Sequence, residues 1–230
     1  MRILALDTAT EACSVALLSG DELIGRSAEG GKSHAQQVLS LIEAVLAEAQ
    51  VSLSMLDGIA ASIGPGAFTG VRVSVAVAQG LAFGAGLPVI PVTTLEALAV
   101  QAMRAGAEHA LACLDARMGE VYWGCFKAHP ARGIAATSVA RVGPPESVAL
   151  PVGGGTYRAI GRGFAAYPAL ALLPDLALDA DDSQALPNAR EVAQLGAVRL
   201  GLGEGIDPAD LSPLYLRDKV ALTEAERAAK

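Results

Sequence analysis

The sequence is poor in aromatic side chains and in cysteine. Phe, Trp and Tyr make up 4% of the 230 residues, although 52% are hydrophobic, so a core must be built from Ala, Val, Leu and Ile. The 3 cysteines cannot all pair with one another, which excludes a disulfide framework that uses every thiol. We expect buried free thiols in a reducing compartment.

Basic charge is also scarce. Lys and Arg number 17 against 24 Asp and Glu, and the formal net charge is −7. A protein that binds a nucleic-acid backbone by itself clusters Lys and Arg to replace condensed counterions. No such stripe is visible here, so if RNA is the substrate we expect another subunit to hold it.

Long apolar runs are missing. The run at residues 3–6 is cut by Asp7 and Glu11, which leaves it short of the ~7–15 apolar residues of a signal peptide. No segment approaches the ~18 uninterrupted apolar residues of a membrane span. These absences predict a soluble, cytoplasmic protein without a membrane partner.

The pattern that is present predicts an α/β fold. Strands at residues 2–6, 13–18 and 22–27 should form an antiparallel meander. A helix over 33–49 should follow, because its apolar residues recur at helical spacing. We expect the later elements in this order: a strand at 58–63, a helix at 71–84, a strand at 88–92, a capped helix at 93–104, strands at 110–114, 120–126 and 136–142, and a helix at 189–202.

A strand meander opens near residue 1 and another near residue 110, which predicts two related lobes, each a mixed sheet flanked by helices. The predicted N-terminal lobe is 1–105 and the C-terminal lobe 106–217. Residues 218–230 are rich in Ala, Glu and Arg without apolar periodicity, so we expect a frayed tail there.

The helix at 33–49 has an unusually wide apolar arc of about 160°. Either a partner covers the excess, or a small domain buries more of this helix than usual. Both interpretations fit the six residues that form the arc: Val38, Leu39, Leu41, Ile42, Val45 and Leu46.

A glycine-rich loop, Gly-Pro-Gly-Ala-Phe-Thr-Gly-Val-Arg at residues 64–72, joins a predicted strand to a predicted helix. Backbone N–H groups in such a loop can point at an anion. No Lys follows the last glycine, which excludes a Walker A loop. A tight strand-to-helix turn and an anion site both explain the pattern.

This loop resembles the signature of the TsaB family. Four further segments resemble that family in the same order: Leu-Asp-Thr-x-Thr at 6–10, Asp-Ala-Arg-Met-Gly-Glu-Val-Tyr at 115–122, Gly-Arg-Gly at 161–163 and Pro-Leu-Tyr-Leu-Arg at 213–217. The resemblance covers nearly the whole chain. Ala67 stands where a Ser is common, so a hydroxyl at that position is not essential to the loop.

The resemblance implies two lobes of the actin-like/sugar-kinase type and a role in the tRNA modification N6-threonylcarbamoyladenosine. In that picture the chain dimerizes with and activates a TsaD-type threonylcarbamoyltransferase, works beside a TsaE-type ATPase, and reaches tRNA only through the complex. In isolation the same surface could form a homodimer. The predicted partner interface lies on helices of the first lobe, at His34, Val38, Leu41, Ile42, Val45, Arg72 and Val75.

The chain is predicted to have no catalytic residue, metal or cofactor of its own. The resemblance implies that the TsaD-type catalytic relative holds its metal with two histidines four residues apart. This chain has only His34, His109 and His129, which lack that spacing. In active members of the superfamily the first turn binds phosphate or metal, which implies an anion or nucleotide site at Asp7, Thr8, Thr10, Gly64, Gly66, Thr69 and Gly70. Alternatively, Asp7 only caps the turn. A nucleotide bound at a subunit interface is a further alternative.

Two other classes of function remain as alternatives. One is an ATP-dependent phosphotransferase or ATPase, which the expected fold and the glycine-rich loop both favour. The other is a peptidase acting on TsaD, although Ser62 lacks the first glycine of a nucleophile elbow because Ala60 stands there.

Overall fold

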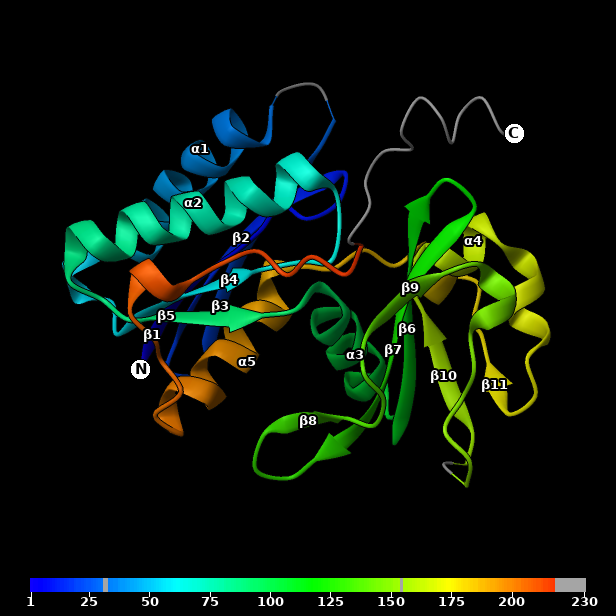
Figure 1. The fold of residues 1–230 in the computed structure, drawn as a ribbon. Coiled ribbons are helices and arrows are strands. Elements are labelled where there is room, and N and C mark those ends of the chain that lie inside the picture. The colour runs from blue at the N-terminus through cyan, green and yellow to red at the C-terminus, as the bar shows by residue number, and fades with distance from the viewer. Residues whose placement is uncertain (31–32, 154, 218–230) are drawn as a thin grey trace.

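The computed structural model describes residues 1–30, 33–153 and 155–217 and contains two sheets, each flanked by helices (Figure 1). The first sheet has the strand order β3-β2-β1-β4-β5. Its strands are β1 (Arg2–Asp7), β2 (Ala12–Ser19), β3 (Glu22–Glu29), β4 (Gly58–Ser62) and β5 (Val89–Val92). The first three pair antiparallel as the predicted meander, and β4 and β5 extend the sheet in parallel.

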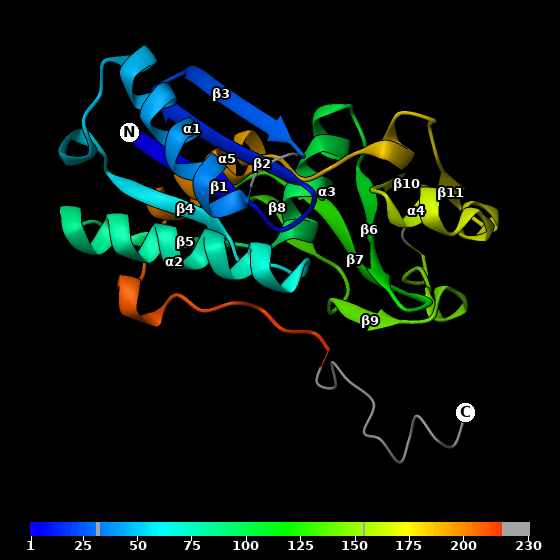
Figure 2. The ribbon, with the colours of Figure 1, turned by 90° about the horizontal axis from the view of Figure 1, so that it is seen from above.

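Helices cover both faces of this sheet. α1 (His34–Ala49) and α2 (Phe68–Ala85) lie side by side on one face, and α5 (Ala189–Gly201) lies on the other (Figures 1 and 2). The alternation along β1 explains this, because successive strand side chains point to opposite faces. Leu4 and Leu6 pack towards α1 and α2, whereas Ile3 and Ala5 pack towards α5.

The second sheet has the strand order β11-β10-β6-β7-β8, and β9 also pairs with β7. Its strands are β6 (His109–Arg117), β7 (Glu120–His129), β8 (Gly133–Ala136), β9 (Arg141–Gly143), β10 (Tyr157–Ile160) and β11 (Leu176–Ala177). The short helix α4 (Gly163–Ala166) packs on the face that also carries Cys113, Trp123 and Tyr157.

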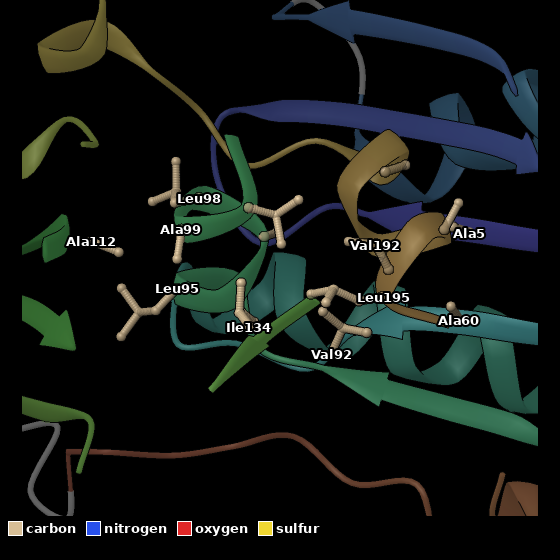
Figure 3. Packing of buried hydrophobic residues seen from close by; sticks show 14 of the residues in the cluster. Ala5, Ala60, Val92, Leu95, Leu98, Ala99, Ala112, Ile134, Val192 and Leu195 are labelled. Atoms are coloured by element: carbon tan, nitrogen blue, oxygen red, sulfur yellow. The ribbon is translucent and has the colours of Figure 1, made fainter. Parts of the chain in front are cut away.

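Two helices fill the space between the sheets: α5 and α3 (Thr94–Arg104). The capping box predicted at the start of α3 is present, since Glu96 N–H donates to Thr93 Oγ1 at 3.2 Å and Thr93 N–H donates to Glu96 Oε2 at 2.8 Å. Leu95 and Leu98 pack with Val192 and Leu195 in one hydrophobic cluster that reaches both sheets (Figure 3).

Most predicted elements are present, but the second lobe differs from the prediction. The strand expected at 136–142 is instead two short strands, β8 and β9. β10, β11 and α4 lie where no element was predicted from the sequence. The domain boundary near residue 105 stays a prediction: it agrees with the division between the sheets, but α5 returns to the first sheet. The predicted frayed tail at 218–230 lies outside the described residues.

Among the described helices, α2 alone is long and apolar enough, by length and composition, to cross a membrane, and 33% of that stretch is buried. One such helix is weak evidence for a membrane span. Its inner residues Val75, Ala78 and Ala82 are buried against the first sheet, and Arg72 interrupts the apolar run.

We predict that Gly196→Ala destabilises the protein. A Cβ at this position of α5 would lie 2.6 Å from the Cβ of Ala60 on β4, so helix and strand would have to separate. We expect the free energy of unfolding to fall by about 1–3 kcal/mol in urea titrations, the usual cost of overpacking a core. Gly80→Ala on α2 is the matched control, because a Cβ there meets no atom within 4 Å. It should be neutral or stabilise the helix by up to about 1 kcal/mol, and an equal effect at both glycines would contradict the prediction.

Candidate functional site

A cleft of about 740 Å³ opens between the two lobes. The β1–β2 turn, the loop before α2, the β6–β7 turn, α4 and the C-terminal segment all contribute to its walls. Its polar and aromatic lining consists of Thr10, Glu11, His34, Phe68, Asp115, Arg117, Tyr122, Arg162, Tyr215 and Arg217. A cleft of this size suits a small-molecule ligand.

Asp7, at the end of β1, lies behind the cleft wall and is 1% exposed. Its Oδ1 accepts a hydrogen bond from Ala9 N–H at 3.1 Å, and its Oδ2 has no hydrogen-bond partner among the described residues. Burial raises the pKa of this carboxyl above its ordinary value, because the charged form loses its hydration. Asp7 therefore caps the turn from inside.

The glycine-rich loop packs directly on the β1–β2 turn. Ala67 N–H donates to the Ala9 carbonyl at 2.7 Å, and Thr8 Oγ1 donates to the Gly70 carbonyl at 2.7 Å. A Cβ on Gly66 would lie 2.2 Å from the Ala9 oxygen, and one on Gly70 would lie 2.0 Å from the Thr8 oxygen. Only glycine allows this approach, so close backbone packing is the physical reason for these two glycines.

Only some of the predicted anion-site residues line the cleft. Thr10 and Gly66 line the cleft, and the buried Oγ1 of Thr10 has no hydrogen-bond partner among the described residues. Gly64 is buried and has a φ of 101°, which a side chain would strain. The remaining members, Asp7, Thr8, Thr69 and Gly70, are not among the lining residues. The anion or nucleotide site stays a prediction.

Three arginines line the cleft, and each is paired with a carboxylate. Arg162 on the second lobe pairs with Glu11 on the first, Arg117 pairs with Asp115 at 3.0 Å, and Arg217 pairs with Glu120. Arg162 and Arg217 lie in two of the motifs that resemble the TsaB family, but nothing local in the sequence indicates their carboxylate partners, which lie 151 and 97 residues away.

The C-terminal segment, residues 208–217, runs along α2 to the second lobe (Figures 1 and 2). Gln79 on α2 donates to the carbonyls of Pro208 and Leu211 at 3.0 Å each. Leu214 N–H donates to the Ile63 carbonyl at 2.7 Å, and Arg217 reaches the Ala116 carbonyl at 3.1 Å. This segment therefore ties the first lobe to the β6–β7 turn.

The predicted partner-interface residues lie at different depths. Four of them, Val38, Ile42, Val45 and Val75, are at most 4% exposed and belong to the chain's own core. His34 and Leu41 are half-buried and Arg72 is exposed. The outward surface of the two helices instead presents Leu39 and Phe83, which are 49% and 80% exposed. The interface assignment stays a prediction. Because the four core residues are buried, they could contribute to such a surface only by packing under its exposed residues.

The described residues offer no group of three or more His, Cys, Asp or Glu side chains that could hold a metal ion. All three cysteines are buried and free. Burial raises the pKa of the Cys13 thiol to about 11, which makes it a poor nucleophile at neutral pH.

Two mixed sheets with flanking helices and a cleft between the lobes define an α/β protein of the actin-like/sugar-kinase type. The family model for TsaD, tRNA N6-adenosine threonylcarbamoyltransferase, matches residues 27–224. The chain is 37% identical to the tRNA threonylcarbamoyladenosine biosynthesis protein TsaB of Escherichia coli, over 96% of each chain. It is 36% identical to the protein of the same name from Haemophilus influenzae, over 96% of this chain and 95% of the relative.

A solved structure of YeaZ from Pseudomonas aeruginosa is 40% identical and superposes with a TM-score of 0.86, covering 94% of this chain and 99% of that one. The chain belongs to the TsaB family, within the wider group that the TsaD model describes. The predicted family and fold class are thereby confirmed, and with the family comes a role in the biosynthesis of threonylcarbamoyladenosine in tRNA.

We predict that Asp7→Asn stabilises the protein at neutral pH. Because the pKa of Asp7 is raised in the folded state, the unfolded chain releases this proton first as pH increases. The wild-type protein should therefore lose stability relative to the variant as pH rises above the ordinary value of 3.8. The check is the difference between the two unfolding free energies across pH 3.5 to 7. The exposed Asp21→Asn provides a flat control, and an equally flat difference for Asp7→Asn would refute the prediction.

Proposed function

We propose that this chain is a non-catalytic subunit that dimerizes with and activates a TsaD-type threonylcarbamoyltransferase. The names of its relatives place the family in threonylcarbamoyladenosine biosynthesis. The match to the TsaD model supports pairing between two subunits of related fold. In this role the chain contributes a surface, and the transfer chemistry belongs to its partner.

The outward face of α1 and α2 is the observation that carries the proposal. Phe83 is 80% exposed and Leu39 is 49% exposed, which is unusual for large apolar side chains. α2 also presents Ala76 and Gly80, both exposed and at helical spacing from Phe83. Small residues allow a second helix to approach closely, and covering Phe83 would remove the most apolar surface from water.

The packing of the first turn supports the absence of catalysis by this chain. Donors that could face a phosphate are engaged here within the chain: the Thr8 hydroxyl donates to the Gly70 carbonyl, and the Ala67 N–H donates to the Ala9 carbonyl. Asp7 lies buried, and its Oδ1 accepts the Ala9 N–H inside the turn.

The proposal includes the rest of the assembly. A TsaE-type ATPase acts beside the pair, tRNA is reached through the complex, and the complex works in the cytoplasm. The net charge of −7 supports the indirect route to tRNA. When the catalytic subunit is absent, the same face can pair with a second copy of this chain, since an isologous dimer needs only one self-complementary patch.

An ATPase or phosphotransferase is the second candidate, favoured by the cleft of about 740 Å³ between the lobes. Its arginines are already neutralised by Glu11, Asp115 and Glu120, so a phosphate would have to displace carboxylates. Measurable ATP turnover by the purified chain, abolished by Asp7→Ala, would favour this candidate.

We predict that adenosine modification requires this chain in an omit-one reconstitution. Purified TsaD-type and TsaE-type proteins, a source of threonylcarbamoyl-AMP and tRNA are combined with or without the chain, and modified adenosine is scored by mass spectrometry. The chain alone should produce none, because the proposal assigns the chemistry to its partner. Equal modification with and without the chain would reject the proposed role.

We also predict that Phe83→Asp weakens pairing with the catalytic subunit at least about 10-fold, because a charge would replace an aromatic anchor. Calorimetric titration measures the affinity, and circular dichroism verifies the fold. Leu172→Asp is the matched control, since Leu172 is 84% exposed and lies in the second lobe. If both variants bind like the wild-type chain, the α1–α2 face is not the interface.

A further inference from the structure

Arg72 occupies an unusual position on the exposed face of α2. Its guanidinium carbon lies 3.5 Å from the centroid of the Phe68 ring and 5.6 Å from that of Tyr215. The two rings are 6.1 Å apart and inclined by 31°. Arg72 Nε also donates a hydrogen bond to the Tyr215 hydroxyl at 2.7 Å. The guanidinium is thus stacked and hydrogen-bonded in one orientation.

The two aromatic neighbours are held by the backbone. Phe68 is the first residue of α2, four positions before Arg72 and therefore on the same helix face. Tyr215 follows Leu214, whose N–H donates to Ile63, and precedes Arg217 by two residues, whose side chain reaches Ala116. The arginine therefore rests against groups that are fixed at both ends.

Among the described residues, Arg72 makes no ion pair with a carboxylate. By contrast, Arg158 and Arg199 contact carboxylates of their own chain at 2.5–2.8 Å. The Nε of Arg72 is used by Tyr215, so its terminal amino groups are the donors that remain for a ligand. A planar guanidinium with two parallel N–H donors matches a carboxylate.

We propose that Arg72, stacked on Phe68 and hydrogen-bonded to Tyr215, binds an aspartate or glutamate side chain of the catalytic subunit. The inference rests on the proposed function and adds the chemistry of one contact. Arg72, Ala76, Gly80 and Phe83 are spaced by four, four and three residues, so they share the outward face of α2. A partner helix that covers Phe83 would meet Arg72 at the end nearer the cleft.

Charge favours a carboxylate on a protein over the phosphates of tRNA. The chain has a formal net charge of −7, and the three arginines of the neighbouring cleft are already paired with Glu11, Asp115 and Glu120. A polyanion would be repelled by the net negative charge and would find the cleft arginines already paired. A single carboxylate on a complementary partner would be placed by the fixed guanidinium with little further loss of side-chain freedom.

The test is the affinity of the purified full-length chain for the purified catalytic subunit, measured by calorimetric titration at two salt concentrations. Arg72→Ala should weaken binding at least about 10-fold, because aromatic-supported arginines are typical binding hot spots. Arg72→Lys should still weaken it about 5-fold, since lysine keeps the charge but lacks the planar fork. Tyr215→Phe should cost about 3-fold by removing one hydrogen bond.

Arg141→Ala is the matched control, because Arg141 is exposed on β9 of the second lobe and makes no ion pair with the carboxylates of the described residues. Its affinity should stay within about 2-fold of wild type, the usual scale for a surface site outside an interface.

Binding by wild type should also weaken more steeply with salt than binding by Arg72→Ala. Arg72→Glu should regain affinity with one Asp→Arg or Glu→Arg variant of the catalytic subunit.

Distinct outcomes separate the two proposals. If the wild-type chain does not bind the catalytic subunit, the proposed function fails. If wild type binds and Arg72→Ala and Arg72→Lys bind equally well, only the assignment of Arg72 is overturned. It is also overturned if Arg72→Ala weakens tRNA binding by the complex, or self-association in sedimentation, while affinity for the catalytic subunit is unchanged.

Discussion

The contact between the glycine-rich loop and the β1–β2 turn determines where the cleft wall and the outer face of α2 lie. Ala67 N–H reaches the Ala9 carbonyl, and Gly66 and Gly70 leave no room for a side chain between the two backbones. This contact fixes the first turn of α2, with Phe68 at the cleft wall and Arg72 on the outer face. A bulkier residue at either glycine would move α2, and the cleft and the outer face of this helix would change together.

The shortage of aromatic residues has a related consequence in the central layer. Small side chains let α5 approach β4 so closely that Gly196 faces Ala60, and α3 presents Leu95, Ala99 and Leu98 to the same cluster (Figure 3). The two sheets therefore share one continuous hydrophobic core. The lobes meet through packed helices, and the cleft opens where the polar turns face each other.

Local patterns predicted the elements whose partners are near in sequence. The meander and the capping box of α3 were predictable, and α2 was correctly read as a helix although Val71, Val73 and Val75 alternate with polar residues. β10 was missed because its pairing with β6 depends on contacts about 48 residues away, as between Arg158 and Ala110. The apolar arc of α1 could not show which residues the chain buries itself, so Val45 and exposed Leu39 looked alike.

The residues from 68 to 72 face two different sides of the protein, and helix geometry explains why. Phe68 and Arg72 are four residues apart and share one face of α2, whereas Gly70 lies two residues from each and so about 200° around the helix. Gly70 consequently points into the β1–β2 turn while Phe68 and Arg72 point outwards. The spacing that packs Gly70 against the β1–β2 turn is therefore the spacing that exposes a stacked arginine on the outer face. A substitution that shifted α2 away from the turn would also displace the outward-facing side chains, so the two properties are mechanically coupled through the first turn of one helix.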